Sequence, residues 1–378
     1  MLNNKAFKRL AEKQNDYCVS IYVPAHDTDT GTESRSFLKR MLKDVSDELI
    51  GKGMSDKDAK RFLFNAYELL QEVELWKHLQ NSFALFITED QFESYKLPYE
   101  AGPFFYVGKR FYLRPLLPAV NGTERFYLLK LSEDQAALLE GNRNELHPVG
   151  ADVVLPDNLE AALERENSEQ NVQRNRGSSA YESPIYENED MGADHNLKQY
   201  KRYAYQVDLG VKKAIADERT PLVLATTDQI APIYKDTSDY LEITPVHISG
   251  KPEDKSEAQL HEKAVEIINN FHHGRQEQRA KAFDEYDKDG KASASVFEVV
   301  AKAYQGEVNT LFVAQDQHSW GSYQDKNETV ELHKERQADS VDLLDLAATH
   351  THLHGGKVYF LPKDKMPQDS TNVCAIFK

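Results

Sequence analysis

The chain has 378 residues, of which 40% are hydrophobic and 29% are charged, as is ordinary for a soluble globular protein. This length suits two or three domains rather than a single core. The formal net charge is −16 and is unevenly spread: residues 1–122 are neutral overall, residues 123–273 carry −12 and residues 274–378 carry −4. Bulk charge therefore does not hold this chain to DNA or RNA, and any RNA contact needs a local basic patch.

The cysteines and the start of the chain indicate the compartment. Cys18 and Cys374 are the only two cysteines, and each lies in an apolar run, which predicts buried reduced thiols and no disulfide framework. No stretch approaches the roughly 18 apolar residues of a membrane span, and the polar first five residues do not form a signal peptide. We expect a cytoplasmic protein without membrane contact.

The first expected domain, residues 1–122, has an α/β pattern. Gly51 and Gly53 separate two helical patterns, and Ser55 is placed to cap the second of them. The polar loop 25–33 includes His26, Asp27 and Asp29, which follow a strand and could form a site. The expected elements are a helix around Phe7 and Leu10, a strand over 18–23, helices over 33–51 and 56–73, a hairpin of strands at 83–88 and 92–97, and a closing segment over 112–117.

The second expected domain, residues 123–273, is organised around one helix and the strand after it. A single apolar stripe at spacings of three and four predicts the helix, and Asp194 is placed as its N-cap. A polar loop over about 165–193 precedes the helix, and a short apolar run over 222–225 predicts a buried strand after it. The stripe consists of Leu197, Tyr200, Ala204, Val207, Val211 and Ala214.

The remaining elements of this domain follow from alternation and helical spacing. Helix 256–286 becomes polar on every side after His272, as helices that bridge domains do, so we place a domain boundary near His273. The other expected elements are a hairpin of strands at 125–131 and 135–141, an acidic helix over 157–167 and a strand at 246–248.

The third expected domain, residues 274–378, has the order αβαββ with short connections, which favours a compact α/β layer fold. Gly306 and the pair Gly355 and Gly356 are placed to end its two helices. The expected elements are a helix over 293–304, a strand over 310–314, a polar loop over 315–335, a helix over 341–353, and strands over 357–361 and 373–377.

These elements, with their short sequence matches, resemble the archaeal and eukaryotic class I release factors and Pelota, in a bacterial form. The helix with strand 221–225 is similar to their middle domain, residues 283–314 and 343–377 to their last domain, and residues 18–26, 76–86 and 113–118 to the N-terminal domain of bacterial relatives. The resemblance implies three α/β domains. The middle one would be a ribonuclease H-like α/β sandwich, and the last a ribosomal-protein-like α/β/α layer fold.

One departure from the family bears on activity. Active release factors carry Gly-Gly-Gln in the middle-domain loop, where the glutamine places water at the peptidyl-tRNA ester. The loop here has neither an adjacent glycine pair nor that glutamine; the residues in its place include Gly177, Gly192, Asp194 and His195. Two glycines let a backbone approach closely, so the resemblance implies no peptidyl-tRNA hydrolysis by this chain.

A basic cluster at the start of the organising helix is the strongest candidate for RNA contact. Lys198, Lys201, Arg202 and Tyr205 lie within two turns and could follow one phosphate path, although a solvated helix face is the simpler interpretation. Lys212 and Lys213 extend this cluster toward the end of the helix. Further candidates are Arg174 and Arg176 on the loop, and Arg275 and Arg279 beside His272 and His273.

Two patterns imitate metal sites. Residues 285–296 resemble a calcium loop around Gly290, but Val296 stands where the bidentate glutamate belongs, so we expect a helix-ending turn. His350 and His354 share a helix face, yet no third ligand is evident, and imidazolium at a helix end suits the dipole. We predict no metal and no cofactor.

Two functions remain open at this point. The first is a translation-associated binding protein that contacts the ribosome or tRNA in a rescue or hibernation role. The alternative is a metal-assisted hydrolase acting on RNA or a nucleotide through the loop carboxylates, because four carboxylates within eight residues could hold a hard cation. These carboxylates are Glu187, Glu189, Asp190 and Asp194.

Overall fold

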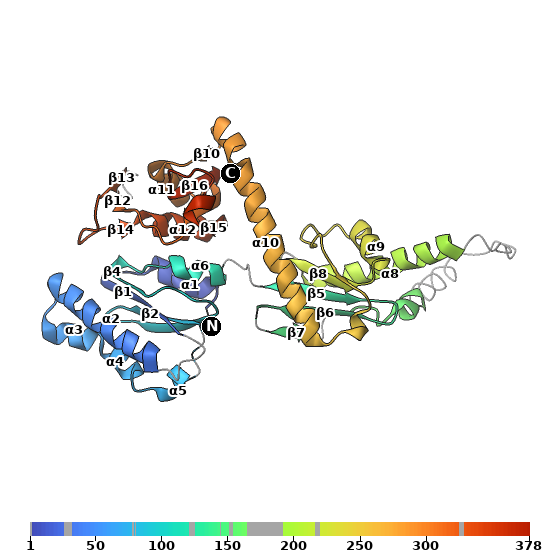
Figure 1. Ribbon diagram of the computed structural model, residues 1–378, viewed down its shortest axis with the longest axis horizontal. Coiled ribbons are helices and arrows are strands. Elements are labelled where there is room, and N and C mark those ends of the chain that lie inside the picture. The colour runs from blue at the N-terminus through green and yellow to red at the C-terminus, as the bar shows by residue number, and fades with distance from the viewer. Residues whose placement is uncertain are drawn as a thin grey trace, which may run out of the picture. The chain divides into compact units, whose positions relative to one another are not determined.

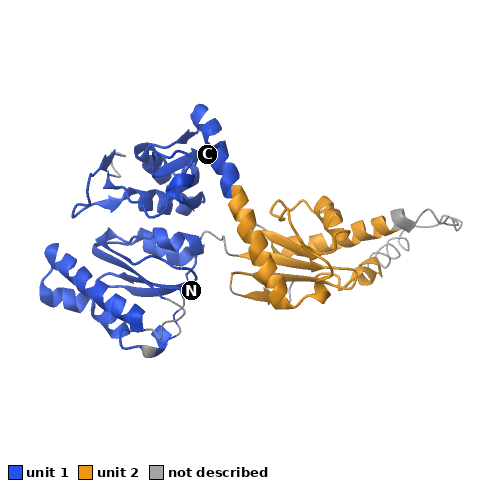
Figure 2. Cartoon of the chain, in the orientation of Figure 1, with its two compact units in different colours: residues 1–123, 276–378 blue, residues 124–275 orange. Residues whose placement is uncertain are grey.

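The computed structural model describes residues 2–25, 32–77, 79, 81–120, 125–143, 145–150, 154–164, 192–215, 220–324 and 329–378. The chain forms two compact units (Figure 2): unit 1 comprises Met1–Thr123 with Gln276–Lys378, and unit 2 comprises Glu124–Arg275. Residues of the expected first and third domains thus share one unit, and the division into three domains stays a prediction. The α/β class is confirmed by mixed sheets and helices in both units.

The first part of unit 1 is a sheet of order β3-β2-β1-β4 with antiparallel pairing; Figure 1 labels β1, β2 and β4 of this sheet. Both faces of β1 are covered, because Val19, Ile21 and Val23 enter one core and Cys18 and Tyr22 enter another. The elements are α1 (Asn4–Glu12), β1 (Gln14–Pro24), α2 (Thr32–Gly51), α3 (Asp56–Phe62), α4 (Phe64–Leu69), α5 (Val73–Lys77), β2 (Ser82–Ile87), β3 (Phe92–Leu97), β4 (Phe104–Arg110), η1 (Arg114–Leu116) and α6 (Leu117–Val120).

Two expectations for this part were wrong. The helix expected over 56–73 is divided, because Leu63 leaves helical geometry at φ −92° and ψ 4° between α3 and α4. Strand β4 was not expected, since Pro98, Gly102 and Pro103 indicated a turn region, yet it pairs along β1 from Tyr22 to Gln14. The cap at Ser55 is confirmed, because its hydroxyl accepts the backbone N–H of Asp58 at 3.1 Å.

The second part of unit 1 holds a sheet of order β10-β16-β11-β15 and a small three-stranded sheet of order β13-β12-β14. The polar loop expected over 315–335 contains the hairpin β12–β13, which sequence polarity concealed because only its Trp320, Tyr323 and Val330 side chains pack on the core. The elements are β10 (Ala292–Ser293), α11 (Val296–Tyr304), β11 (Val308–Ala314), β12 (Trp320–Gln324), β13 (Thr329–Leu332), β14 (Val341–Asp342), α12 (Leu343–Leu353), β15 (Lys357–Leu361), η4 (Lys363–Lys365) and β16 (Val373–Phe377).

Unit 2 is an α/β sandwich around a sheet of order β7-β6-β5-β8-β9, in which β5, β8 and β9 are parallel. Tyr127 and Leu129 face a core built with α8 and α9, whereas Phe126 and Leu128 face a core built with α10. Residues 159–164 are helical within the acidic helix expected over 157–167. The elements are β5 (Phe126–Leu131), β6 (Ala136–Gly141), β7 (Leu146–Pro148), α8 (Gly192–Ala214), β8 (Leu222–Thr226), α9 (Ile230–Thr237), β9 (Ile248–Ser249), η3 (Pro252–Asp254) and α10 (Glu257–Lys288).

Helix α10 continues without a break from unit 2 into unit 1, as its polar second half predicted. Leu260, Ala264 and Ile268 anchor its first half in unit 2, and the fully buried Phe283 anchors its end in unit 1. Gly290 follows the helix with φ +67°, so the segment that imitates a calcium loop is a helix-ending turn, as expected. Within the described part of the chain, no helix is long and apolar enough to cross a membrane.

Candidate functional site

Helix α8 carries the strongest sequence candidates, and its buried face differs from the predicted stripe. Ala204, Val207 and Val211 are buried as predicted, but Leu197 is 40% exposed. Tyr203 is buried instead and donates its hydroxyl hydrogen to the backbone oxygen of Ser132 at 2.9 Å. The helix begins at Gly192, so Asp194 lies inside it and the expected N-cap position was wrong.

The outward face of α8 combines cationic side chains with exposed apolar ones. Lys198, Lys201 and Arg202 are exposed, and so is 56% of the Tyr205 side chain. Residues at i and i+4 lie above one another on a helix, which aligns Leu197, Lys201, Tyr205 and Leu209 on one line. We call Lys198, Lys201, Arg202 and Tyr205 the α8 basic face.

Lys212, which the sequence grouped with this cluster, has another role. Lys212 pairs with the buried carboxylate of Asp208 at 2.9 Å and also with Asp239. Hydrogen bonds to Asp239 and then to Asp208 raise the pKa of Lys212. Because Lys212 is committed to these carboxylates, it does not extend the α8 basic face, whereas Lys213 is exposed.

The two arginines of α10 also make internal contacts. Arg275 pairs with Glu242 at 2.5 Å and lies over the Phe271 ring, with its guanidinium carbon 4.3 Å from the ring centroid. Arg279 donates to Asn309 Oδ1 at 3.1 Å and to the hydroxyl of Thr310. Each arginine therefore fastens α10 to a neighbouring segment, and RNA contact by either one stays a prediction that would have to compete with these bonds.

Several candidates lie outside the described residues. They include Arg174, Arg176 and Gly177 of the loop before α8, the carboxylates Glu187, Glu189 and Asp190, and the possible site His26, Asp27 and Asp29. Gly192, Asp194 and His195 belong to the first turn of α8, where the backbone alone is described. Among described residues, no group of three or more His, Cys, Asp or Glu side chains could hold a metal ion.

The histidines near the end of α12 are packing residues. His350 stacks on Tyr304 with ring centroids 3.6 Å apart, and burial lowers the pKa of His350 to about 4. A neutral imidazole at this position corrects the expectation of an imidazolium interacting with the helix dipole. His354 Nδ1 lies 2.9 Å from the backbone oxygen of His350, so the two rings do not converge on a shared ligand position.

A group that the sequence did not reveal lies at the carboxyl end of β8. Asp228 Oδ1 is 2.9 Å from His247 Nε2 and 2.8 Å from Ser249 Oγ. The hydrogen bond from Ser249, and then the one from His247, lower the pKa of Asp228. A catalytic triad needs the carboxylate on one imidazole nitrogen and the hydroxyl on the other. Here Ser249 Oγ lies 3.4 Å from the same Nε2, so the group fastens β9 to the end of β8 rather than activating a nucleophile.

A protein-family model matches part of the chain. Residues 126–270 match the family model described as bacterial archaeo-eukaryotic release factor family 7, which spans most of unit 2. Over these residues the match agrees with the resemblance found in the sequence, that to a bacterial form of the release factors and Pelota. No curated protein matches the chain.

Solved structures of three related proteins are similar to this chain at low identity. An archaeal translation termination factor, aRF1, is 15% identical with a TM-score of 0.22, and the alignment covers 99% of this chain and 96% of that one. Dom34 of S. cerevisiae, a translation termination-like factor, is 13% identical with a TM-score of 0.38 over 79% and 78%. Pelota of Archaeoglobus fulgidus is 12% identical with a TM-score of 0.27 over 78% and 79%.

Proposed function

We propose that this chain is a translation-associated binding protein that contacts ribosomal or transfer RNA through the α8 basic face. The proposal rests on one observation: Lys198, Lys201 and Arg202 are all exposed on one helix, in a segment (residues 123–273) whose sequence carries a net charge of −12. The match of unit 2 to a release factor family supports RNA of the translation machinery as the partner.

The chemistry of this face suits a single-stranded or looped RNA. Lysine and arginine neutralise phosphates, and an exposed tyrosine offers a ring on which an unpaired base can stack. Tyr205 lies one helical turn from Lys201 and about one turn from Arg202, so a stacked base and its flanking phosphates can be held together. Residues 123–273 carry a net charge of −12, which repels RNA elsewhere on this segment, so we expect RNA to contact it through the α8 basic face.

Peptide release does not form part of the proposed function. The sequence before α8 has no Gly-Gly-Gln, and the group of Asp228, His247 and Ser249 does not have the geometry of a catalytic triad. A binding role, such as occupying or rescuing ribosomes, needs none of these groups. The hydrolase alternative depends on Glu187, Glu189 and Asp190, which lie outside the described residues, and no observation favours it.

Co-sedimentation with ribosomes from the source cell tests the proposal. The parent chain should pellet with ribosomes at low salt, whereas a variant with Lys198, Lys201 and Arg202 all changed to Glu should remain in the supernatant. A matched control changes Lys39, Arg40 and Lys43 of α2 to Glu, which alters net charge by the same amount on exposed residues of unit 1. Equal pelleting of the parent and the α8 variant would contradict the proposal.

A further inference from the structure

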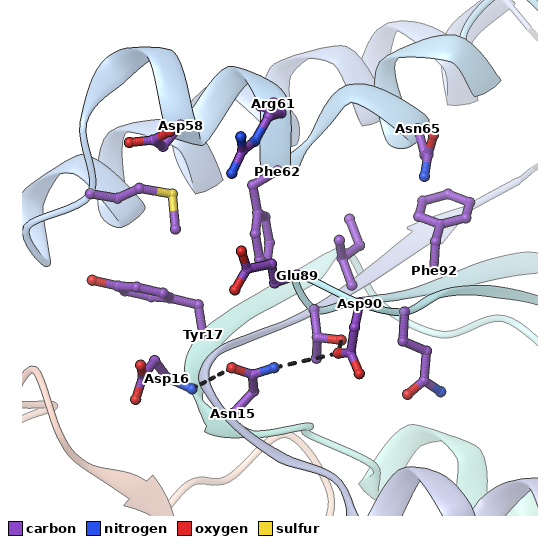
Figure 3. A pocket seen from close by; sticks show the side chains of 14 residues that line it. Asn15, Asp16, Tyr17, Asp58, Arg61, Phe62, Asn65, Glu89, Asp90 and Phe92 are labelled. Atoms are coloured by element: carbon purple, nitrogen blue, oxygen red, sulfur yellow. Dashed lines mark hydrogen bonds between the residues drawn. The ribbon is translucent and has the colours of Figure 1, made fainter.

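A pocket of about 710 Å³ lies within unit 1, between helix α3, the beginning of β1 and the turn that joins β2 to β3 (Figure 3). Its volume is in the range of about 300–1,000 Å³ that binding sites for small groups have. Residues 15–17 and 89–92 line the strand side, and Asp58, Arg61 and Phe62 line the helix side. The pocket is separate from the α8 basic face and independent of the function proposed for it.

The apolar part of the lining includes three aromatic side chains. Tyr17, Phe62 and Phe92 are partly buried and pack against the core beneath α2. The Tyr17 hydroxyl donates to the backbone oxygen of Lys52 at 3.2 Å, which holds its ring at the edge of the pocket. Aromatic faces attract cations, most strongly where water is partly excluded.

The charged part of the lining is predominantly negative: four carboxylates and one guanidinium border the pocket. Two of the carboxylates have protein partners, since Asp90 pairs with Lys13 at 2.7 Å and Asp58 accepts the Ser55 hydroxyl at 2.6 Å. The other two, Asp16 and Glu89, have no side-chain partner among the residues that the structure describes. Their oxygens are available to a ligand, and their charge disfavours phosphates and nucleotides.

From this combination of aromatic faces and available carboxylates, we propose that the pocket binds an arginine side chain presented by a basic polypeptide. A guanidinium is planar, so it can stack on Tyr17 or Phe62 while its forked N–H groups meet the two oxygens of Glu89. An ammonium group would meet the carboxylate as a point charge and would gain less from the rings. The pocket therefore prefers arginine to lysine.

Arg61 adds a positive charge to the helix side of the pocket. Figure 3 shows Arg61 extending from α3 on the helix side, opposite Glu89 and Asp16 on the strand side. Arg61 has no hydrogen bond or ion pair within the described residues, so it repels a bound cation rather than being neutralised by a carboxylate. The proposal thus predicts opposite effects for two neighbouring changes: removing Glu89 weakens binding, and removing Arg61 strengthens it.

The test uses the full chain and a blocked tripeptide with arginine between two glycines, followed by backbone amide NMR. Addition of the peptide should shift the amides of Tyr17, Phe62 and Glu89, and the same peptide with citrulline, a neutral isostere of arginine, should not. Glu89→Gln should weaken binding about tenfold, the size expected for one charge-assisted contact. Arg61→Gln should strengthen it about twofold, as expected for one screened like charge at a surface. Glu72→Gln, an exposed residue outside the pocket, should change nothing.

Each of the following results would contradict a different part of the proposal. Equal binding of the citrulline peptide, or unchanged binding by Glu89→Gln, would overturn recognition of a cation. Adenosine monophosphate shifting the same amides more strongly than the peptide would show a nucleotide site instead. Ethylguanidine binding as tightly as the peptide would overturn the polypeptide as ligand. Glu89 is exposed in a turn, so its substitution leaves the fold intact.

Discussion

The carboxylate of Asp345 accepts the backbone N–H of Leu113 at 2.8 Å, across 232 residues of the chain. The same oxygen also accepts the N–H of Arg114 at 2.5 Å. Asp345 belongs to α12, whereas Leu113 and Arg114 follow β4. These bonds therefore join the two sequence segments of unit 1. Asp345 is buried, which makes the bond both strong and sensitive to charge.

This contact predicts a pH dependence of stability in unit 1. Burial, and then the neighbouring Asp342 carboxylate, raise the pKa of Asp345 from 3.8 to about 7. Between these values the folded form keeps a proton that the unfolded form has released, so the contribution of Asp345 to stability falls as the pH rises from about 4 to 7. Asp345→Asn keeps an oxygen acceptor without the charge, so it should remove this part of the pH slope and add on the order of 1 kcal/mol at pH 8.

Urea unfolding followed by tryptophan fluorescence between pH 5 and pH 8 measures this slope. The chain has two tryptophans, Trp76 and Trp320, and both lie in unit 1, so the signal reports this unit alone. A variant with the same pH slope as the parent would show that Asp345 does not titrate in this range.

Arg114 should be a major stabilising residue of the same region. It is 8% exposed, donates to the backbone oxygen of Gln317 at 2.8 Å and lies 3.6 Å from Asp342 Oδ2. Arg114→Ala removes the cation beside the buried Asp342 carboxylate together with the bond to Gln317, and it should cost about 3 kcal/mol in the same fluorescence assay. Arg9→Ala removes an exposed pair with Glu93 and should cost far less, so equal losses in the two variants would contradict this assignment.

The revised buried face of α8 gives a second pair of stability predictions. Val207→Ala removes methyl groups from a fully buried position and should destabilise unit 2 by about 2 kcal/mol. Leu197→Ala changes a side chain that is 40% exposed and should cost less than about 0.5 kcal/mol. Native-state hydrogen exchange of the β5 and β8 amides reports unit 2 directly. Equal losses of protection in both variants would show that Leu197 is part of the core.

The chain should not release peptides from ribosomes. A release assay on programmed ribosomes carrying peptidyl-tRNA should give ester cleavage at the water rate, because no Gly-Gly-Gln is present to place the attacking water. Cleavage above that rate would show that another group in this chain performs the reaction.

The sequence predicted elements with a clear local apolar pattern better than elements without one. The apolar face in the first half of α10 and the apolar run of strand β8 predicted these two elements, and both were found where expected. Strand β4 and the hairpin β12–β13 were missed because they depend on pairing partners distant in the sequence, which local alternation does not encode.

The sites show the same limit. The exposure of Lys198, Lys201 and Arg202 followed correctly from helical spacing, since it depends on one local stripe. The partners of Lys212 and Arg275 could not be predicted, because Asp239 and Glu242 reach them only through the tertiary fold. The pocket beside Tyr17 was likewise hidden, since its lining comes from three parts of the chain that are distant in the sequence.

The salt dependence of ribosome binding tests the central claim most directly. Each phosphate contact contributes about one unit to the slope of log affinity against log salt. Changing Lys198, Lys201 and Arg202 to Glu should therefore abolish co-sedimentation at moderate salt and flatten the residual slope by up to about three units. The α2 control variant at Lys39, Arg40 and Lys43 should keep the parent slope. Unchanged affinity and slope in the α8 variant would contradict RNA contact at this face.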